Sequence, residues 1–104
     1  MDHQVRENGQ GKIMKDIFQP RSEPAKSIYE AFQLEASMRD GRSLDEWQAA
    51  ERAAVHREAA IQAHKLALHV PTMEQVEQAE RHAFGSIDYG AKWASAVVSS
   101  MRPL

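Results

Sequence analysis

The 104-residue chain contains no cysteine. Disulfide frameworks, zinc ribbons, iron–sulfur clusters and thiol catalysis are therefore excluded. No apolar stretch approaches the roughly 18 residues of a membrane-spanning helix. The first residues, Met1–Gln10, are polar and charged, so we expect no secretory signal. The prediction is a cytoplasmic protein that does not associate with membranes.

An excess of one charge is also missing. Thirteen Lys and Arg residues stand against fifteen Asp and Glu residues, which gives a net charge of −2. Proteins dedicated to nucleic acids usually have a basic stripe or an alkaline pI. Nucleic acid is therefore an unfavoured partner, although a local basic patch is compatible with a neutral total.

Strand patterns are a third absence, because no segment alternates apolar and polar residues. Apolar residues instead recur at three- and four-residue steps, which predicts an all-α fold. We expect a small bundle of about four helices near residues 24–40, 44–69, 73–84 and 87–101. These helices would form a single domain over 22–104, and residues 1–21 would form a flexible tail.

The tail contains one short apolar segment. Ile13, Ile17 and Phe18 lie at helical spacing with Met14 beside them, which predicts a short helix near 12–18. Two helical turns are only marginally stable alone. The segment would therefore dock on its own domain, bind a partner or stay mobile. The three spaced residues are candidate partner-binding residues.

Helix boundaries are marked by residues that satisfy the free backbone groups at helix ends. Ser43 with Glu46, and Thr72 with Gln75, have the spacing of capping boxes, in which each side chain bonds the other residue's backbone. Gly41 suits the left-handed position that ends the first helix. These signals agree with the apolar periodicity, which strengthens the helical prediction.

The longest predicted helix has no Gly or Pro before Pro71, which is expected to stop it. Trp47, Ala54, Ile61 and Leu68 recur every seven residues and form a narrow seam. At roughly 1.5 Å per residue the helix would span about 40 Å, more than a compact domain of this size needs. Pairing with another helix, as in a homodimer, is typical of this pattern.

The last helix has the clearest apolar stripe and is expected to start after Ser86. Its stripe consists of Ile87, Ala91, Ala94, Val98 and Met101. Tyr89 and Trp93 lie off this stripe and, four residues apart, share a face. That face either closes the core or forms an aromatic patch for dimerisation or partner binding. Both are therefore candidate partner-binding residues.

Glu74, Glu77 and Glu80 line one side of the third helix. The simpler interpretation is a solvated acidic face. The functional interpretation is an acidic strip that binds a basic partner, which makes all three candidate partner-binding residues. Catalysis by paired carboxylates would need a pocket that shifts their pKa values.

No pattern of catalytic, cofactor-binding or metal-ligating residues is found. The five histidines lack the helical spacing that would bring them together with another ligand on one metal ion. Neither a nucleophile constellation nor a Gly-rich phosphate loop is visible. We therefore expect neither an enzyme nor a bound cofactor.

The segment Phe84–Gly90 between the last two helices offers a helix-turn-helix interpretation. A recognition helix normally presents Arg, Lys, Asn or Gln to DNA. The first turns of the candidate helix offer only Lys92 and Ser95. A DNA-binding regulator is therefore an alternative and not the main prediction.

Five short strings support a resemblance to a known group of proteins. They are Glu35–Ser37, Gly41–Trp47, Glu51–Val55, Ala79–Arg81 and Gly85–Tyr89. In this order they resemble small hypothetical proteins of tailed bacteriophages and prophages, over about residues 25–98. The resemblance implies an accessory protein that binds and inhibits or redirects a host protein in the host cytoplasm. The main prediction is thus a non-enzymatic protein-binding module, with a DNA-binding regulator and a structural homodimer as alternatives.

Overall fold

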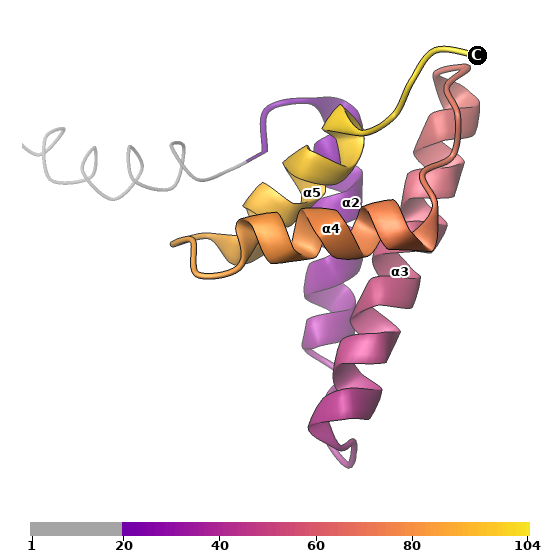
Figure 1. The fold of residues 1–104 in the computed structure, drawn as a ribbon. Coiled ribbons are helices and arrows are strands. Elements are labelled where there is room, and N and C mark those ends of the chain that lie inside the picture. Colours follow the sequence, from indigo (N-terminus) through magenta and orange to yellow (C-terminus); the bar gives the residue numbers. More distant parts are fainter. Residues whose placement is uncertain (1–19) are drawn as a thin grey trace, which may run out of the picture.

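The computed structural model describes residues 20–104, and Figure 1 shows their arrangement. Four helices follow one another in this part of the chain: α2 (Glu23–Ala36), α3 (Leu44–Lys65), α4 (Met73–Ala83) and α5 (Tyr89–Ser99). Residues 20–104 contain no strand, so the predicted all-α bundle is confirmed. The predicted helix near 12–18, with Ile13, Ile17 and Phe18, lies outside the described residues.

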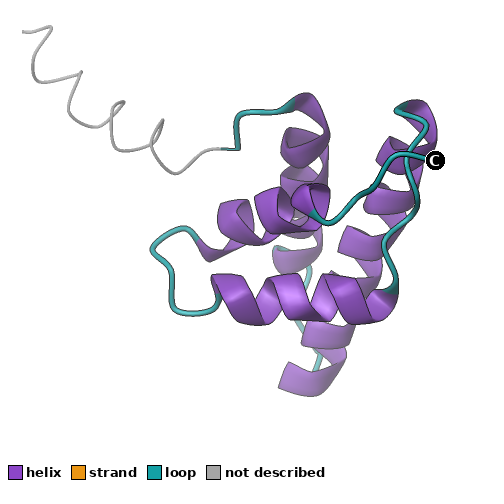
Figure 2. Cartoon of the chain, turned by 45° about the horizontal axis from the view of Figure 1, so that its top comes forward, coloured by secondary structure: helices purple, strands orange, loops and turns teal. Residues whose placement is uncertain are grey.

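The four helices share one continuous core. α2 and α3 run side by side in opposite directions, and α4 crosses over α3 (Figure 1). α5 packs against both α2 and α4 (Figure 2). Because each helix buries a face against at least two others, the core extends without interruption from α2 to α4. None of the four described helices combines the length and the apolar character that crossing a bilayer requires.

α2 ends earlier than the sequence predicted, at Ala36 instead of residue 40. The Ser37 hydroxyl donates to the Leu34 carbonyl at 2.7 Å and so satisfies one of the last backbone acceptors of the helix. Gly41 has the expected left-handed φ of +79°. It lies in the turn beyond the helix, however, so the prediction that it caps α2 was wrong.

α3 also ends early, at Lys65. Ala67 adopts a left-handed φ of +57°, and the Leu68 N–H donates back to the Ala63 carbonyl at 2.8 Å. This is a Schellman ending, which satisfies a free helix carbonyl, here without a glycine. Pro71 therefore lies beyond the helix and does not stop it.

The segment after α3 is held by the last residues of the chain. The His69 N–H donates to the Arg102 carbonyl at 2.7 Å, and Leu68 forms an isolated β-bridge with Pro103. The Leu104 N–H donates to the Ala67 carbonyl at 3.4 Å. These partners are far apart in the sequence, so local patterns gave no sign of the pairing.

The two predicted capping boxes are confirmed. The Glu46 N–H donates to the Ser43 hydroxyl at 3.2 Å, and the Ser43 N–H donates to the Glu46 carboxylate at 3.0 Å. Thr72 and Gln75 make the same two bonds at the start of α4. Local hydrogen bonding therefore determines where α3 and α4 begin.

The start of α5 was predicted too early. Its N-cap is Asp88, whose carboxylate accepts the Ala91 N–H at 3.1 Å, and not Ser86. Ile87 consequently lies in the turn, where it is 81% exposed, instead of leading the apolar stripe. The Asp88 carboxylate also accepts from the Tyr29 hydroxyl, which ties this turn to α2.

Trp93 lies at the centre of the core. Its side chain is fully buried, and its indole N–H donates to the Val76 carbonyl of α4 at 3.0 Å. The Phe32 ring of α2 packs edge-on against it, with ring centres 5.4 Å apart. Because α5 has neighbours on two sides, Trp93 faces the core although the sequence placed it off the apolar stripe, and Val97 is buried as well.

The buried face of α3 differs from the predicted seven-residue seam. Ile61 is 46% exposed, whereas Glu51, Val55 and Ala59 are buried at four-residue steps. α3 packs against α2 and is crossed by α4, and these contacts select the buried face. The predicted seam was therefore wrong at Ile61, and a carboxylate, that of Glu51, occupies a core-facing position.

Candidate functional site

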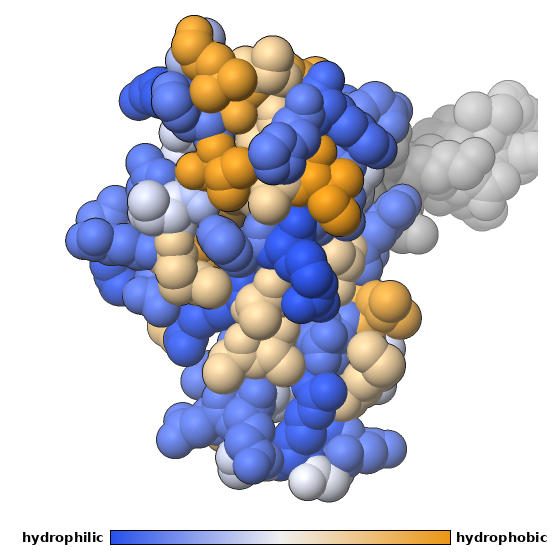
Figure 3. Space-filling model, turned by 90° about the vertical axis from the view of Figure 1, so that its right-hand side faces the viewer, coloured by the Kyte–Doolittle hydropathy of each residue, from blue (hydrophilic) through white to orange (hydrophobic). Residues whose placement is uncertain are grey.

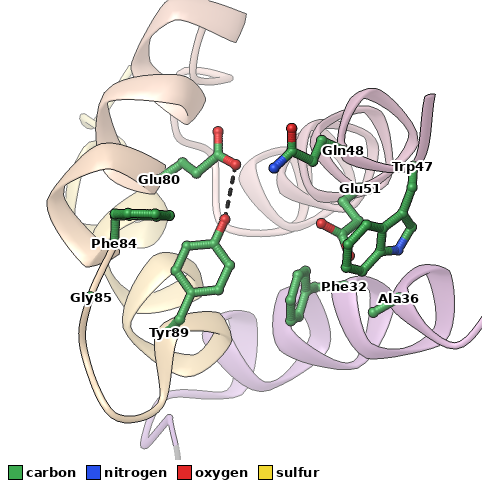
Figure 4. A pocket seen from close by; sticks show the side chains of 9 residues that line it. All are labelled: Phe32, Ala36, Trp47, Gln48, Glu51, Glu80, Phe84, Gly85 and Tyr89. Atoms are coloured by element: carbon green, nitrogen blue, oxygen red, sulfur yellow. Dashed lines mark hydrogen bonds between the residues drawn. The ribbon is translucent and has the colours of Figure 1, made fainter. Parts of the chain in front are cut away.

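A pocket of about 300 Å³ lies where α2 and α3 meet α4, α5 and the turn between them. Figure 4 shows its side chains. The lining residues are Phe32, Ala36, Trp47, Gln48, Glu51, Glu80, Phe84, Gly85 and Tyr89. The volume is at the lower end of the range for ligand pockets. Its composition is specific, because four aromatic residues surround two carboxylates.

Aromatic rings form most of the walls. Tyr89 lies between Phe32 and Phe84, with ring centres 5.8 and 6.3 Å away and ring planes at 76° and 88°. Trp47 lies on the opposite side of the pocket (Figure 4). The Arg39 guanidinium lies over the Trp47 ring, 4.7 Å from its centre. Rings in this arrangement bind apolar groups and cations.

Glu51 is a buried carboxylate with incomplete hydrogen bonding. Only 4% of the residue is exposed, and its Oε2 has no hydrogen-bond partner among residues 20–104. In Figure 4 its carboxyl group points toward the space between Phe32 and Gln48. Burial, followed by repulsion from Glu80 and Glu35, raises the pKa of Glu51 to about 7. Near neutral pH the group therefore exists in both charge states.

Glu80 lines the same pocket but has both oxygens engaged. Its Oε1 accepts from the Arg52 Nε at 2.7 Å, and its Oε2 accepts from the Tyr89 hydroxyl at 2.9 Å. Burial of the phenol, and then its hydrogen bond to Glu80, raise the pKa of Tyr89, so the phenol keeps its proton at neutral pH. Glu80 is thus a structural carboxylate that joins α3, α4 and α5.

Two glycines allow this arrangement. Gly85 has a left-handed φ of +87° in the turn that forms one edge of the pocket. A Cβ atom at Gly90 would collide with the rings of Phe32 and Tyr29. The absence of a side chain at Gly90 therefore lets α5 approach α2 closely enough to place Tyr89 beside Phe32.

A second hollow of about 230 Å³ adjoins the pocket. The two share Gln48, Glu80 and Phe84, and the second is completed by Arg52 and Arg81. The second hollow thus adds two arginines to the aromatic and acidic residues that line the pocket. Two adjoining hollows suit a segment of polypeptide, which can place a different side chain in each.

The three predicted glutamates do not form one acidic strip. Glu74 is exposed and Glu77 is half-buried, but Glu80 is buried and paired with Arg52. The interpretation as a continuous solvated or partner-facing strip was therefore wrong at Glu80. The reason is the crossing of α4 over α3, which turns this position toward the pocket.

Tyr89 and Trp93 share a face as predicted, with ring centres 5.6 Å apart. Trp93 is fully buried, so the alternative of an exposed aromatic patch was wrong for this residue. Tyr89 is half-buried and lines the pocket. On this shared face, Trp93 therefore belongs to the core and Tyr89 belongs to the pocket.

Sequence reasoning missed the remaining members of the pocket. Trp47 was placed on the seven-residue seam of the long helix, and Phe32 and Glu51 were not among the candidate residues. One signal was present, because Glu51 lies four residues before Val55 and therefore shares its buried face. A carboxylate on such a face is rare unless it is paired or functional.

Other candidate sites are weaker. Among residues 20–104, no three His, Asp or Glu side chains come together in a way that could hold a metal ion. A ring nitrogen of His56 lies 3.0 Å from the Pro71 carbonyl, where it joins α3 to the segment before α4. On α5, Lys92 and Ser95 are exposed, while the opposite face of the helix is buried.

A second apolar surface lies at the C-terminal end of α3. Figure 3 shows apolar side chains gathered at one end of this side of the molecule. Ile61, Leu66 and Leu104 are 46%, 47% and 79% exposed. The pairing of the last residues with the segment after α3 brings Leu104 to this end. The surface is separated from the pocket, which is near the start of α3.

No protein-family model matches the chain, and no curated protein or solved structure does so either. The resemblance to phage accessory proteins therefore stays a prediction. Function has to be argued from the chemistry of the site.

Proposed function

We propose that this protein is a non-enzymatic module that binds another protein through the pocket and its rim. The main support is an open, aromatic-lined recess with Phe84, 79% exposed, at its edge and Ile87, 81% exposed, in the adjoining turn. Large apolar side chains that are this exposed beside a recess are typical of protein-binding surfaces.

The identity and the restricted motion of the aromatic side chains in the pocket also support protein binding. Tyr and Trp are enriched among the residues that dominate binding energy at interfaces, and the pocket contains Tyr89 and Trp47. Tyr89 is already fixed by its hydrogen bond to Glu80 and by its contact with Phe32. Little side-chain freedom is therefore lost when a partner binds.

The pocket chemistry favours binding over catalysis. No serine, threonine, histidine or lysine is among the lining residues. Glu80 is engaged by Arg52 and Tyr89, which leaves Glu51 as the carboxylate with a free oxygen. A single carboxylate without a second acid, base or nucleophile lacks the partner groups that acid–base or covalent catalysis uses.

The alternative functions have less support. Lys92 is the sole basic residue of α5, and phosphate contacts by basic residues supply much of the affinity for DNA. Along the exposed face of α3, Arg57 and Lys65 flank Ile61 at four-residue steps, which interrupts an apolar dimer interface. A host protein is the partner that the resemblance to phage proteins implies, and it remains part of the proposal.

Affinity purification from a bacterial lysate treated with nuclease tests the proposal. Three tagged forms of the full chain are compared: the wild type, the rim variant Phe84→Ala/Ile87→Ala, and the control Leu66→Ala at the other end of α3. We expect the wild type and the control to retain the same stoichiometric protein and the rim variant to lose it. Equal retention by all three forms would contradict a role of the rim, and recovery of nucleic acid alone would favour a DNA-binding regulator.

A further inference from the structure

Glu51 has a carboxyl oxygen that the described fold does not pair. In the same region, Glu80 is bonded to Arg52 and Glu35 to Arg42, each at 2.7 Å. Within residues 20–104, Glu51 Oε2 lacks a hydrogen-bond partner. Buried polar groups are nearly always satisfied, and an exception indicates a role for a ligand or another bound group. Glu51 lines the pocket, and its carboxyl group points toward the space between the pocket walls (Figure 4).

The walls around Glu51 suit a cation. Phe32, Trp47, Phe84 and Tyr89 line the pocket, and the faces of aromatic rings carry negative electrostatic potential. Aromatic faces next to a carboxylate attract an organic cation more strongly than a neutral group of the same size. A Mg²⁺ or Ca²⁺ ion fits less well, because such ions need several oxygen ligands and the rings provide none.

A guanidinium group suits the chemistry of the site better than an ammonium group. It is planar and weakly hydrated, it stacks on aromatic rings, and it bonds a carboxylate through two N–H groups. The molecule already contains both kinds of contact, in Arg39 over Trp47 at 4.7 Å and in Arg52 on Glu80 at 2.7 Å.

We infer that the pocket binds the guanidinium group of an arginine side chain from a protein partner, with Glu51 accepting its N–H groups and the aromatic rings covering its faces. This inference rests on the proposed function, because it names the part of the partner that enters the pocket. The adjoining hollow beside Arg81 is placed to take a residue next to that arginine in the same segment.

A pair of short peptides provides the direct test. Acetyl-Gly-Arg-Gly-amide and its citrulline counterpart, which has the same shape without the charge, are titrated into the full-length protein labelled with ¹⁵N. We expect NMR shifts at Trp47 and Tyr89, and at least about tenfold weaker binding of the citrulline peptide because it lacks the charge-assisted bonds. Equal affinity of the two peptides, or shifts confined to other regions, would overturn the inference.

Two isosteric variants separate the pocket from general charge attraction. Glu51→Gln removes the charge and one of the two acceptor oxygens of the proposed contact. Glu77→Gln removes the same charge from α4, at a residue that does not line the pocket. We expect the preference for arginine over citrulline to disappear in Glu51→Gln and to persist in Glu77→Gln, with the folded NMR spectrum retained in both. Similar losses in the two variants would mean that net charge, and not the pocket, selects the peptide.

The pH dependence gives an independent readout. The charged and titratable groups that face Glu51 are Glu35, Arg39, Arg52, Glu80 and Tyr89. With a pKa of about 7, Glu51 is mostly protonated at pH 6 and mostly ionised at pH 8, so arginine binding should strengthen about tenfold over this range. The Glu51→Gln variant should lose this dependence. A wild-type affinity that is constant over the range would contradict the role of Glu51.

Failure of this inference is distinguishable from failure of the proposed function. If the arginine and citrulline peptides bind alike but the rim variant still loses the captured protein, the rim is an interface and the guanidinium inference is wrong. If arginine is preferred but the rim variant retains every captured protein, the proposed function is wrong instead.

Discussion

The core around Trp93 and the pocket around Glu51 differ in how completely their buried polar groups are hydrogen-bonded. Trp93 is fully buried, and its indole N–H is bonded to the Val76 carbonyl. On α3, by contrast, Glu51 Oε2 and Trp47 Nε1 are buried without a hydrogen-bond partner in the described part of the chain. Phe32 belongs to both regions, because it contacts the Trp93 ring and also lines the pocket.

The difference separates stability from binding. The region around Trp93 has what a core needs, namely close packing and a bonded polar group. The region around Glu51 lacks some of these hydrogen bonds, and Glu51 itself lines an open pocket. Substitutions in the first region should therefore change unfolding, and substitutions in the second should change binding with a small loss, or even a gain, of stability.

The largest expected effect is that of Trp93→Ala. Removing this side chain leaves a cavity between α2, α4 and α5, and should lower the free energy of unfolding by about 3–5 kcal/mol. Trp47→Ala, at a half-buried ring, should cost less, about 1–2 kcal/mol. Urea unfolding of the full chain measures both. Equal losses would contradict the distinction between a closed core and an open pocket.

Gly90→Ala should have the next largest effect. The new methyl group would meet the rings of Phe32 and Tyr29 and push α5 away from α2, at a cost of about 1–3 kcal/mol. Gly41→Ala is the control, because a Cβ there meets open space and the cost comes from its positive φ alone, about 1 kcal/mol. Thermal unfolding of the two variants should rank them in this order, and the reverse order would show that α5 can move without loss.

Glu51→Gln should stabilise the protein at alkaline pH. Folding raises the pKa of Glu51 from 4.5 to about 7, so the folded state binds this proton more tightly than the unfolded state does. The contribution of this group to stability is therefore complete below pH 4.5 and is lost as the pH rises through about 7. After allowance for solvent in the open pocket, the variant should exceed the wild type by about 1–2 kcal/mol at pH 8.

The same two proteins should be nearly equal in stability at pH 4, where Glu51 is protonated and resembles glutamine. Urea unfolding at pH 4 and pH 8 gives both differences. A wild type that is the more stable form at pH 8 would indicate that ionised Glu51 has a stabilising partner, which would contradict the description of the pocket.

Tyr89→Phe should have a smaller effect, a loss of about 1 kcal/mol, because it removes one hydrogen bond to Glu80 and leaves the bond from Arg52. Tyr29→Phe removes the longer bonds to Asp88, at 3.2 and 3.3 Å, and should cost less. Chemical denaturation compares the two. A larger loss of stability in Tyr29→Phe would show that the hydrogen bond to Asp88, the N-cap of α5, contributes more than the bond between Tyr89 and Glu80.

Phe84→Ala should have the smallest effect on stability, within about 0.5 kcal/mol, since the residue is 79% exposed. It should nevertheless weaken retention of the captured protein, because this ring forms the edge of the pocket. A large change in the unfolding midpoint would show that Phe84 is part of the core and would remove it from the proposed interface.

The pocket could be predicted only in part. Tyr89 was a candidate because aromatic residues four apart stand out on any helix. Glu51 was not a candidate, since its burial depends on how α2 and α4 pack against α3, and no short-range pattern in α3 specifies that packing. The misplaced starting point of α5 has a similar origin, because Asp88 both caps the helix and accepts from Tyr29 of α2.

The sequence by itself determined the helical class and the capping boxes at Ser43 and Thr72, because these depend on hydrogen bonds between residues no more than four positions apart. The tertiary structure decided which face of α3 is buried and that the pKa of Glu51 is raised. Both properties depend on packing and on electrostatic interactions between different helices. The pocket, and the functions proposed for it, exist only where those helices meet.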